Sequence, residues 1–155
     1  MELINSKNKK LDLREIIVRA LQLEKQTTAN PASLQDMSTK VIAELSLKTT
    51  EAIQIGNTFF IAQRGQKFPN KLEGRFLNVD TGKNFVQNFY NYMAHLQRDG
   101  VTHYISELKD KRLAPAMELV SNKLRSVDTT VSVAANSKTL GVFVKFGKQP
   151  IKMEE

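Results

Sequence analysis

Apolar residues along the chain follow two spacings, one typical of strands and one typical of helices. Between residues 76 and 106 a short apolar run gives way to apolar residues three and four apart, and a second run rich in strand-forming residues follows. Asp80 or Thr81 can cap the helix, and Asp99-Gly100 ends it. The apolar stripe of the helix consists of Phe85, Val86, Phe89, Tyr92, Met93 and Leu96. This stretch predicts a strand, a crossover helix and a second strand that is parallel to the first.

The residues before this unit predict two helices and a three-stranded antiparallel meander. The first helix covers residues 11–26, and the second starts at Asn30-Pro31, where Asn is an N-cap and Pro takes the first helical position. A β-hairpin follows over residues 50–66, and residues 71–79 form the third strand, antiparallel to the second.

The residues after the unit predict one more helix and a hairpin. The helix covers residues 113–126, and residues 129–135 and 140–146 alternate between apolar and polar positions as strands do. The order is therefore α-α-β-β-β-α-β-α-β-β, an α/β (α+β) fold with a mixed central sheet. We expect an N-terminal arm over residues 1–10, a single domain over residues 11–147 and a polar C-terminal tail over residues 148–155.

Composition narrows the possible chemistry. The 155 residues are 41% hydrophobic, which is enough for one domain with a substantial core. The chain has no Cys and only two His, so we expect no disulfide, no Cys nucleophile and no metal site. No apolar run approaches the roughly 20 residues that a membrane-spanning helix needs, so we expect no membrane span.

The formal net charge is +7, which is compatible with an anionic partner such as nucleic acid, an anionic assembly or a phosphorylated cofactor. The Lys and Arg residues are, however, scattered along the whole chain. This distribution favours the simpler interpretation of a solvated basic surface, because nucleic-acid sites usually gather their basic residues on one face.

The order of elements over residues 11–147 resembles the fold of the GNAT (N-acetyltransferase) superfamily, with its usual first strand missing or replaced by the N-terminal arm. In that family, backbone amides at the start of the helix after the third antiparallel strand hold the pyrophosphate of acyl-CoA. The corresponding segment is 78–84, and the family pattern of Gly-x-Gly or Gly-x-Ala is reduced here to one Gly beside Asp80. The resemblance implies that acetyl-CoA, if it binds, contacts Thr81, Gly82, Lys83 and Asn84.

The same resemblance gives only two candidates for catalysis. The family often uses a Tyr on the helix that corresponds to residues 113–126, and this helix contains no Tyr. His103 and Tyr104 on the preceding strand are the remaining candidates, with His103 as a possible base, since imidazole groups can exchange protons near neutral pH. The simpler interpretation of His103 is a polar residue on a strand face, and His103 and Ser106 point to opposite faces.

The run from residue 78 to 104 also resembles GNAT-like virion proteins of short-tailed bacteriophages, in which a polar turn and an Asn- and Phe-rich helix replace the glycine-rich loop. This resemblance implies a non-catalytic structural or accessory virion component that contacts other virion proteins, further copies of itself or, non-specifically, packaged DNA. The protein would then be located in the virion, and otherwise in the cytoplasm. The alternatives are an acyl-CoA-dependent N-acyltransferase, with its site where strands 72–79 and 101–106 diverge, and a small basic nucleic-acid-binding protein.

Overall fold

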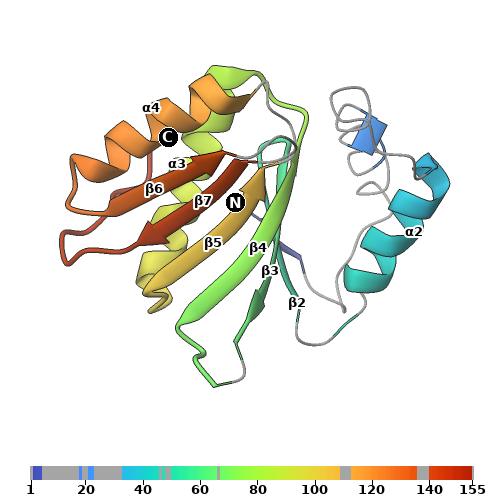
Figure 1. Cartoon of the computed structure of the whole chain (residues 1–155), viewed down its shortest axis with the longest axis horizontal. Helices are drawn as coiled ribbons and strands as arrows, with labels where there is room; N and C mark the ends of the chain where they lie inside the picture. Colours follow the sequence, from blue (N-terminus) through green and yellow to red (C-terminus); the bar gives the residue numbers. More distant parts are fainter. Residues whose placement is uncertain are drawn as a thin grey trace.

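A computed structural model describes residues 2–4, 18, 21–22, 33–45, 47, 50–65, 67–108, 113–135 and 140–154. Seven strands form one sheet in the order β1-β2-β3-β4-β5-β7-β6 (Figure 1). The elements are β1 (Glu2–Ile4), α2 (Leu34–Leu45), β2 (Thr50–Ile55), β3 (Thr58–Arg64), β4 (Lys71–Asn78), α3 (Gly82–Arg98), β5 (His103–Leu108), α4 (Ala114–Arg125), β6 (Thr130–Ala135) and β7 (Leu140–Lys145).

The sheet is mixed, as predicted. All neighbouring strands are antiparallel except β4 and β5, which are parallel and joined by α3. The parallel pairing is short: it joins Lys71–Gly74 to His103–Ser106 and then ends. The carboxyl-terminal half of β4 continues to pair with β3, while β5 continues to pair with β7. The two central strands therefore diverge toward their carboxyl ends, and the sheet opens between them.

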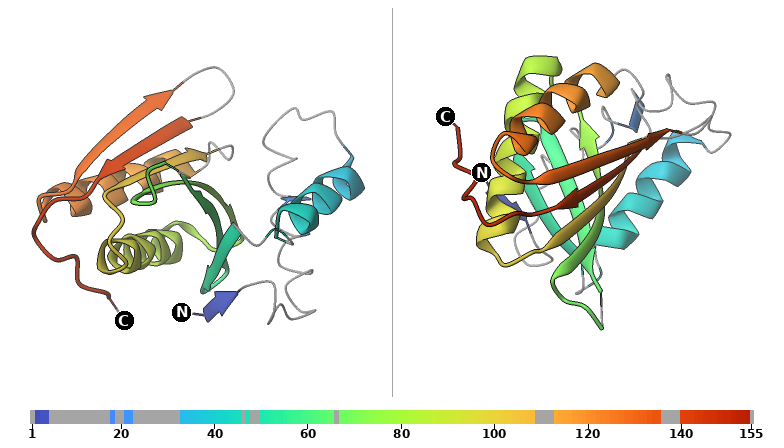
Figure 2. Two further views of the ribbon diagram at one scale, coloured as in Figure 1. Left: turned by 90° about the horizontal axis from the view of Figure 1, so that it is seen from below. Right: turned by 60° about the vertical axis from the view of Figure 1, so that its left-hand side comes forward.

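Helices cover the two faces of the sheet unequally. In both views of Figure 2, α3 and α4 lie on one side of the sheet and α2 lies on the other. The larger core cluster lies beneath α3 and α4, and the smaller one lies between α2 and the strands β2, β3 and β4. Because successive strand residues point to opposite faces, β3 contributes Phe60 and Ala62 to the large core and Phe59 and Ile61 to the small one.

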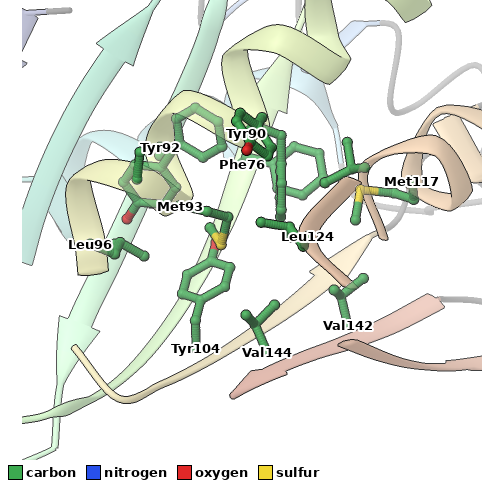
Figure 3. Packing of buried hydrophobic residues seen from close by; sticks show 14 of the residues in the cluster. Phe76, Tyr90, Tyr92, Met93, Leu96, Tyr104, Met117, Leu124, Val142 and Val144 are labelled. Carbon is green, nitrogen blue, oxygen red and sulfur yellow. The ribbon is translucent and has the colours of Figure 1, made fainter. Parts of the chain in front are cut away.

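Aromatic rings fill the large core, and three of its seven described buried aromatic side chains, Phe85, Phe89 and Tyr92, come from the predicted stripe of α3. Phe60 stacks on Tyr92 with ring centroids 4.0 Å apart, and Phe76 packs against Phe85 at 5.2 Å. Figure 3 shows Tyr92, Met93 and Leu96 of α3 near Tyr104 of β5, with Leu124 of α4 above Val142 and Val144 of β7. This packing explains why the aromatic stripe is structural, as helical spacing beside Met and Leu predicts.

Three expectations near the N-terminus need comment. The usual first strand was expected to be missing or replaced by the N-terminal arm, and Glu2–Ile4 of the arm form β1, which pairs with β2. Ser33 caps α2, because its Oγ accepts a hydrogen bond from the amide of Asp36 at 3.1 Å, and the predicted cap Asn30 lies outside the described residues. The predicted helix over residues 11–26 lies outside the described residues, apart from the helical residues 18, 21 and 22.

Candidate functional site

A cleft opens where β4 and β5 diverge, on the face of the sheet that α3 and α4 leave uncovered. Glu73 of β4 pairs directly with Ile105 of β5, and Ile105 pairs with Phe143 of β7, so the three side chains share this face. The cleft has a volume of about 410 Å³. We call it the open-face cleft; it is lined by Gln63, Glu73, Gly74, Arg75, Phe76, Ile105, Ser106, Glu107, Gly141 and Phe143.

The lining of the open-face cleft combines charge with exposed apolar surface. Glu73 and Glu107 are exposed carboxylates from the two diverging strands, and Ile105 and Phe143 are 42% and 44% exposed. Gly74 lies at the last pair of the parallel register, and a Cβ there would lie 2.6 Å from the carbonyl oxygen of Ile61. The close approach of β3 at this point therefore requires glycine. The two carboxylates attract an ammonium group and the apolar side chains suit an apolar body, while Arg75 adds one basic side chain to the same lining.

A second hollow lies on the helix side of the sheet. It has a volume of about 560 Å³, and we call it the α3–α4 groove. Its lining brings together the first turns of both helices, with Gly82 and Lys83 from α3 and Pro115 and Ala116 from α4. The amides of a first helical turn have no acceptor within the helix, and the helix dipole is positive there. Both helices follow the carboxyl ends of parallel strands, which is where open α/β sheets bind ligands.

The four predicted cofactor residues lie at the start of α3. Thr81 is the N-cap and makes no side-chain hydrogen bond to the helix. Thr81, Gly82, Lys83 and Asn84 are all exposed, and a Cβ built on Gly82 meets nothing within 4 Å. The first turn of α3 is thus accessible to an anionic ligand. That acetyl-CoA is this ligand stays a prediction.

Asp80, which the sequence places beside the expected phosphates, belongs to a polar network beneath the turn. Its carboxylate accepts hydrogen bonds from the amide and Nδ2 of Asn57 at 3.0 and 3.1 Å, and from Nδ2 of Asn88 at 2.6 Å. Asn88 Nδ2 also lies 3.0 Å from Oγ1 of the fully buried Thr58, which donates to Asn78 Oδ1 at 2.7 Å. The carboxylate therefore ties the β2–β3 turn to the start of α3, and its negative charge is shared by several donors.

The two predicted catalytic candidates occupy opposite faces of β5. His103 is half-buried, and its Nδ1 lies 2.9 Å from the hydroxyl of Thr102. It lies at the start of the parallel pairing, where Lys71 is its partner, and it does not line the open-face cleft. Tyr104 points into the large core and is fully buried, and this burial raises the pKa of its phenol.

The surroundings of Tyr104 argue for a structural role. Its hydroxyl is close to that of Ser106, two residues along the same face, but neither group has a hydrogen bond of good geometry among the described residues. A phenol enclosed by core side chains, without a partner or access to solvent, is poorly placed to exchange protons with a substrate. The structure therefore separates His103 and Tyr104 and brings neither to the open-face cleft.

The structure also identifies three side chains that the sequence analysis overlooked, Glu73, Lys123 and Glu154. Glu73 and Glu107 belong to separate strands, and Lys123 and Glu154 meet only because the C-terminal segment packs on α3. The alternation of β4 and β5 could have placed Glu73 and Glu107 on the outer face, but no local pattern reveals that the strands diverge between them.

Neither a metal cluster nor a membrane helix is found in the part of the chain that the structure describes. No three His, Asp or Glu side chains there come together as possible metal ligands. No helix among these residues has both the length and the apolar character needed to cross a bilayer.

Comparison with known proteins now gives the class of the fold. No family model matches the chain, and no curated protein matches it in sequence. An acetyltransferase from Thermus thermophilus superposes with a TM-score of 0.56 at 14% identity, covering 93% of this chain and 95% of that one.

Two further acetyltransferases are similar over their lengths. Tetrahymena GCN5 has a TM-score of 0.55 at 8% identity, with 96% of this chain and 98% of that one covered. The ribosomal-protein-S18-alanine N-acetyltransferase of Escherichia coli has a TM-score of 0.51 at 12% identity, with 99% and 96% covered. At these identities the likeness establishes a GNAT-like fold and no more.

The comparison also corrects the functional prediction. We expected a non-catalytic component of a bacteriophage virion, but the three similar structures are all acetyltransferases. The virion interpretation is therefore wrong, and the alternative named beside it, an N-acyltransferase, agrees better with these structures. Contacts with DNA or with further copies of the chain stay predictions.

Proposed function

We propose that this protein is an acyl-CoA-dependent N-acyltransferase. The observation that carries the proposal is the divergence of β4 and β5 beyond Gly74 and Ser106, with the exposed first turn of α3 at the end of β4. The α3–α4 groove lies on one side of the sheet and the open-face cleft on the other. Two substrates that approach from opposite faces can meet at such an opening, which supports group transfer between them. The similar acetyltransferase folds support the same conclusion.

The donor side of the proposed site is the start of α3 together with the α3–α4 groove. Acyl-CoA would supply the acyl group as a thioester. The amides of Gly82, Lys83 and Asn84, with the Lys83 ammonium group, would hold its phosphates, since amides and dipole at a helix start favour anions. The apolar side chains of Val86, Pro115 and Leu119 would line the remainder of the donor.

The acceptor side is the open-face cleft. An amine binds there as an ammonium ion and must lose a proton before its nitrogen lone pair can attack a carbonyl carbon. Glu73 or Glu107 would accept this proton, since a carboxylate within hydrogen-bond reach of the amine can serve as a general base. Attack of the amine on the thioester carbonyl carbon would form the C–N bond of the amide and break the C–S bond, and CoA would leave as a thiolate that takes up a proton. Ile105 and Phe143 would contact the apolar body of the acceptor.

Calorimetric titration with acetyl-CoA tests the donor site. We expect saturable binding to the wild type and about tenfold weaker binding to Lys83→Glu, which reverses a charge at an anion site. Gly82→Val should also weaken binding, because its side chain would project into the open space at the first turn. Lys40→Glu is the matched control, since Lys40 is exposed on α2 on the other side of the sheet.

Two results would contradict the proposal. Acetyl-CoA that fails to bind the wild type would remove the donor site altogether. Equal loss of affinity in Lys83→Glu and Lys40→Glu would assign the effect to net charge and not to the start of α3.

A further inference from the structure

The C-terminal segment, Gly147 to Glu154, packs along α3. Gln97 Nε2 donates to the carbonyl oxygens of Gly147 and Gln149 at 3.1 and 3.0 Å, and Gln97 Oε1 accepts from the amide of Ile151 at 2.8 Å. Ile151 is buried in the large core. One side chain of α3 thus satisfies three backbone groups of the segment and fixes its path across the helix.

Closer to the start of α3, a second anchor holds the end of the segment. Asn91 Nδ2 donates to the carbonyl oxygen of Glu154 at 2.7 Å, and Asn91 Oδ1 accepts from the amide of Glu154, also at 2.7 Å. This reciprocal pair presents the Glu154 side chain to α4. Glu154 Oε1 lies 2.5 Å from Lys123 Nζ, and the same ammonium group lies 4.5 Å from the centroid of the Tyr90 ring.

This ion pair lies in the lining of the α3–α4 groove. Lys83, at the start of α3, and Lys123, further along α4, are the two basic side chains of that lining, and Glu154 is its acidic one. The Glu154 carboxylate is therefore paired with the Lys123 ammonium group, to which a phosphorylated ligand in the groove would otherwise be attracted. Both partners are partly exposed, at 36% and 44% of their side chains, so the pair is a weak contact that a ligand can displace.

We propose that the C-terminal segment is a competing strap: Glu154 holds Lys123 and thereby lowers the affinity of the α3–α4 groove for phosphorylated ligands. A ligand whose phosphate reaches Lys123 displaces Glu154, and the strap remains attached through Gln97 and Ile151. This inference rests on the proposed function for the nature of the donor, but it concerns regulation of the groove and not the transfer step.

The test is calorimetric titration of the full chain with two probes, CoA and inorganic pyrophosphate. Glu154→Gln keeps the shape of the side chain and removes its charge, so it should tighten CoA binding about two- to fivefold, the range expected for loss of an exposed competing ion pair. Asn91→Ala, which removes both backbone contacts of Glu154 while leaving its charge, should tighten binding in the same direction. Glu118→Gln, an exposed position on α4, is the control of equal charge change and should leave affinity unchanged.

A second substitution separates competition from a general charge effect. In a Lys123→Met background, Glu154→Gln should no longer alter CoA affinity, because the cation for which the carboxylate competes is absent. A gain in the Glu154→Gln variant that persists in this background, or that Glu118→Gln reproduces, would overturn the strap.

The outcomes distinguish the strap from the proposed function. Equal CoA affinity in the wild type and Glu154→Gln overturns the strap and leaves the N-acyltransferase intact. Tighter binding of pyrophosphate and CoA in Glu154→Gln, with no acyl transfer to any amine, supports the strap and overturns the enzyme. Failure of every variant to bind either probe overturns both.

Discussion

Phe59 and Phe60 are neighbours on β3, both fully buried, yet they belong to different parts of the molecule. Phe60 enters the large core under α3 and α4, where it contacts the rings of Phe76, Phe89 and Tyr92 at centroid distances of 6.0, 5.9 and 4.0 Å. Phe59 enters the small cluster under α2, whose other described members are the aliphatic side chains of Leu21, Met37, Val41, Ala52, Ile61, Leu77 and Val79.

This difference shows how one sheet can provide both stability and a site. The face under α3 and α4 is packed with buried side chains from β2 to β7. These rings and aliphatic side chains hold the strands and α3 in place. On the other face, the described part of the chain places Leu21 and α2 over β2, β3 and β4, and Ile105 and Phe143 are exposed beside the opening between β4 and β5. The rigid face fixes the strands, and the uncovered face is accessible to a ligand.

The largest effect should come from deleting the two rings. Phe60→Ala and Phe59→Ala should each lower the free energy of unfolding by about 3–5 kcal/mol, with Phe60→Ala the costlier, because it also loses ring–ring contacts worth about 0.5–1.5 kcal/mol each. Urea unfolding followed by circular dichroism measures both. A larger loss for Phe59→Ala would reverse the comparison and make the α2 side the main source of stability.

The next effect concerns activity on the open face. Glu73→Gln should lower kcat/KM for acyl transfer about 100-fold if Glu73 accepts the proton of the amine, while the exposed position leaves the free energy of unfolding unchanged. Glu107→Gln is the matched comparison from the opposite strand, and the larger loss identifies the base. Wild-type kcat/KM in both variants, measured with the same amine, would contradict a catalytic role for the cleft carboxylates.

A smaller effect is expected at Asp80, whose carboxylate joins the β2–β3 turn to α3. Asp80→Ala should lower the free energy of unfolding by about 1–3 kcal/mol, because it leaves donors of Asn57 and Asn88 without their acceptor. It should also weaken acetyl-CoA binding, because the network positions the first turn of α3. Asp80→Asn, which keeps one acceptor, should lose less of both. An Asp80→Ala variant that binds acetyl-CoA more tightly would instead indicate that the carboxylate repels the ligand.

The smallest effect is predicted for the phenol of Tyr104. Burial raises its pKa above the ordinary 10.0, so below that pH the group is neutral in the folded and unfolded chain and stability does not depend on it. Above pH 10 the unfolded chain ionises first, and folding stability falls as the pH rises further. Tyr104→Phe should make this fall shallower and, at pH 7, stabilise the fold by up to about 1 kcal/mol, because an unpaired hydroxyl is removed.

Urea unfolding at about pH 7 and about pH 10.5, on either side of the ordinary phenol pKa, measures this last prediction. Tyr90→Phe is the control, because it removes a phenol hydroxyl from the same core. The Tyr90 ring, which contacts Lys123 through its face, is kept in this variant. A strongly destabilised Tyr104→Phe at neutral pH would mean that the hydroxyl has a partner, and it would return Tyr104 to the set of candidate functional groups.

The sequence alone determined the elements from α2 to β7 and the faces they present, whereas β1 was predicted only as part of an arm. The spacing of apolar residues predicted α3 and its buried stripe, the hairpins and the parallel pair, because helical and strand periodicities are local properties of the chain. The β-hairpin over residues 50–66 was predicted in the same way, and Gly56 in its turn has the positive φ of 58° that such a turn needs. The GNAT-like order of elements followed from these local signals.

Only the tertiary structure decided where those elements leave space. The divergence of β4 from β5 was expected only from the family resemblance and not from any local pattern. The joining of Glu73 and Glu107 in one cleft and the ion pair between Lys123 and Glu154 depend on contacts between distant residues. The same is true of Asp80, whose carboxylate meets a turn formed much earlier in the chain. Periodicity specifies which side of an element is buried, but the separation of two strands is set by everything packed against them, and no local pattern encodes it.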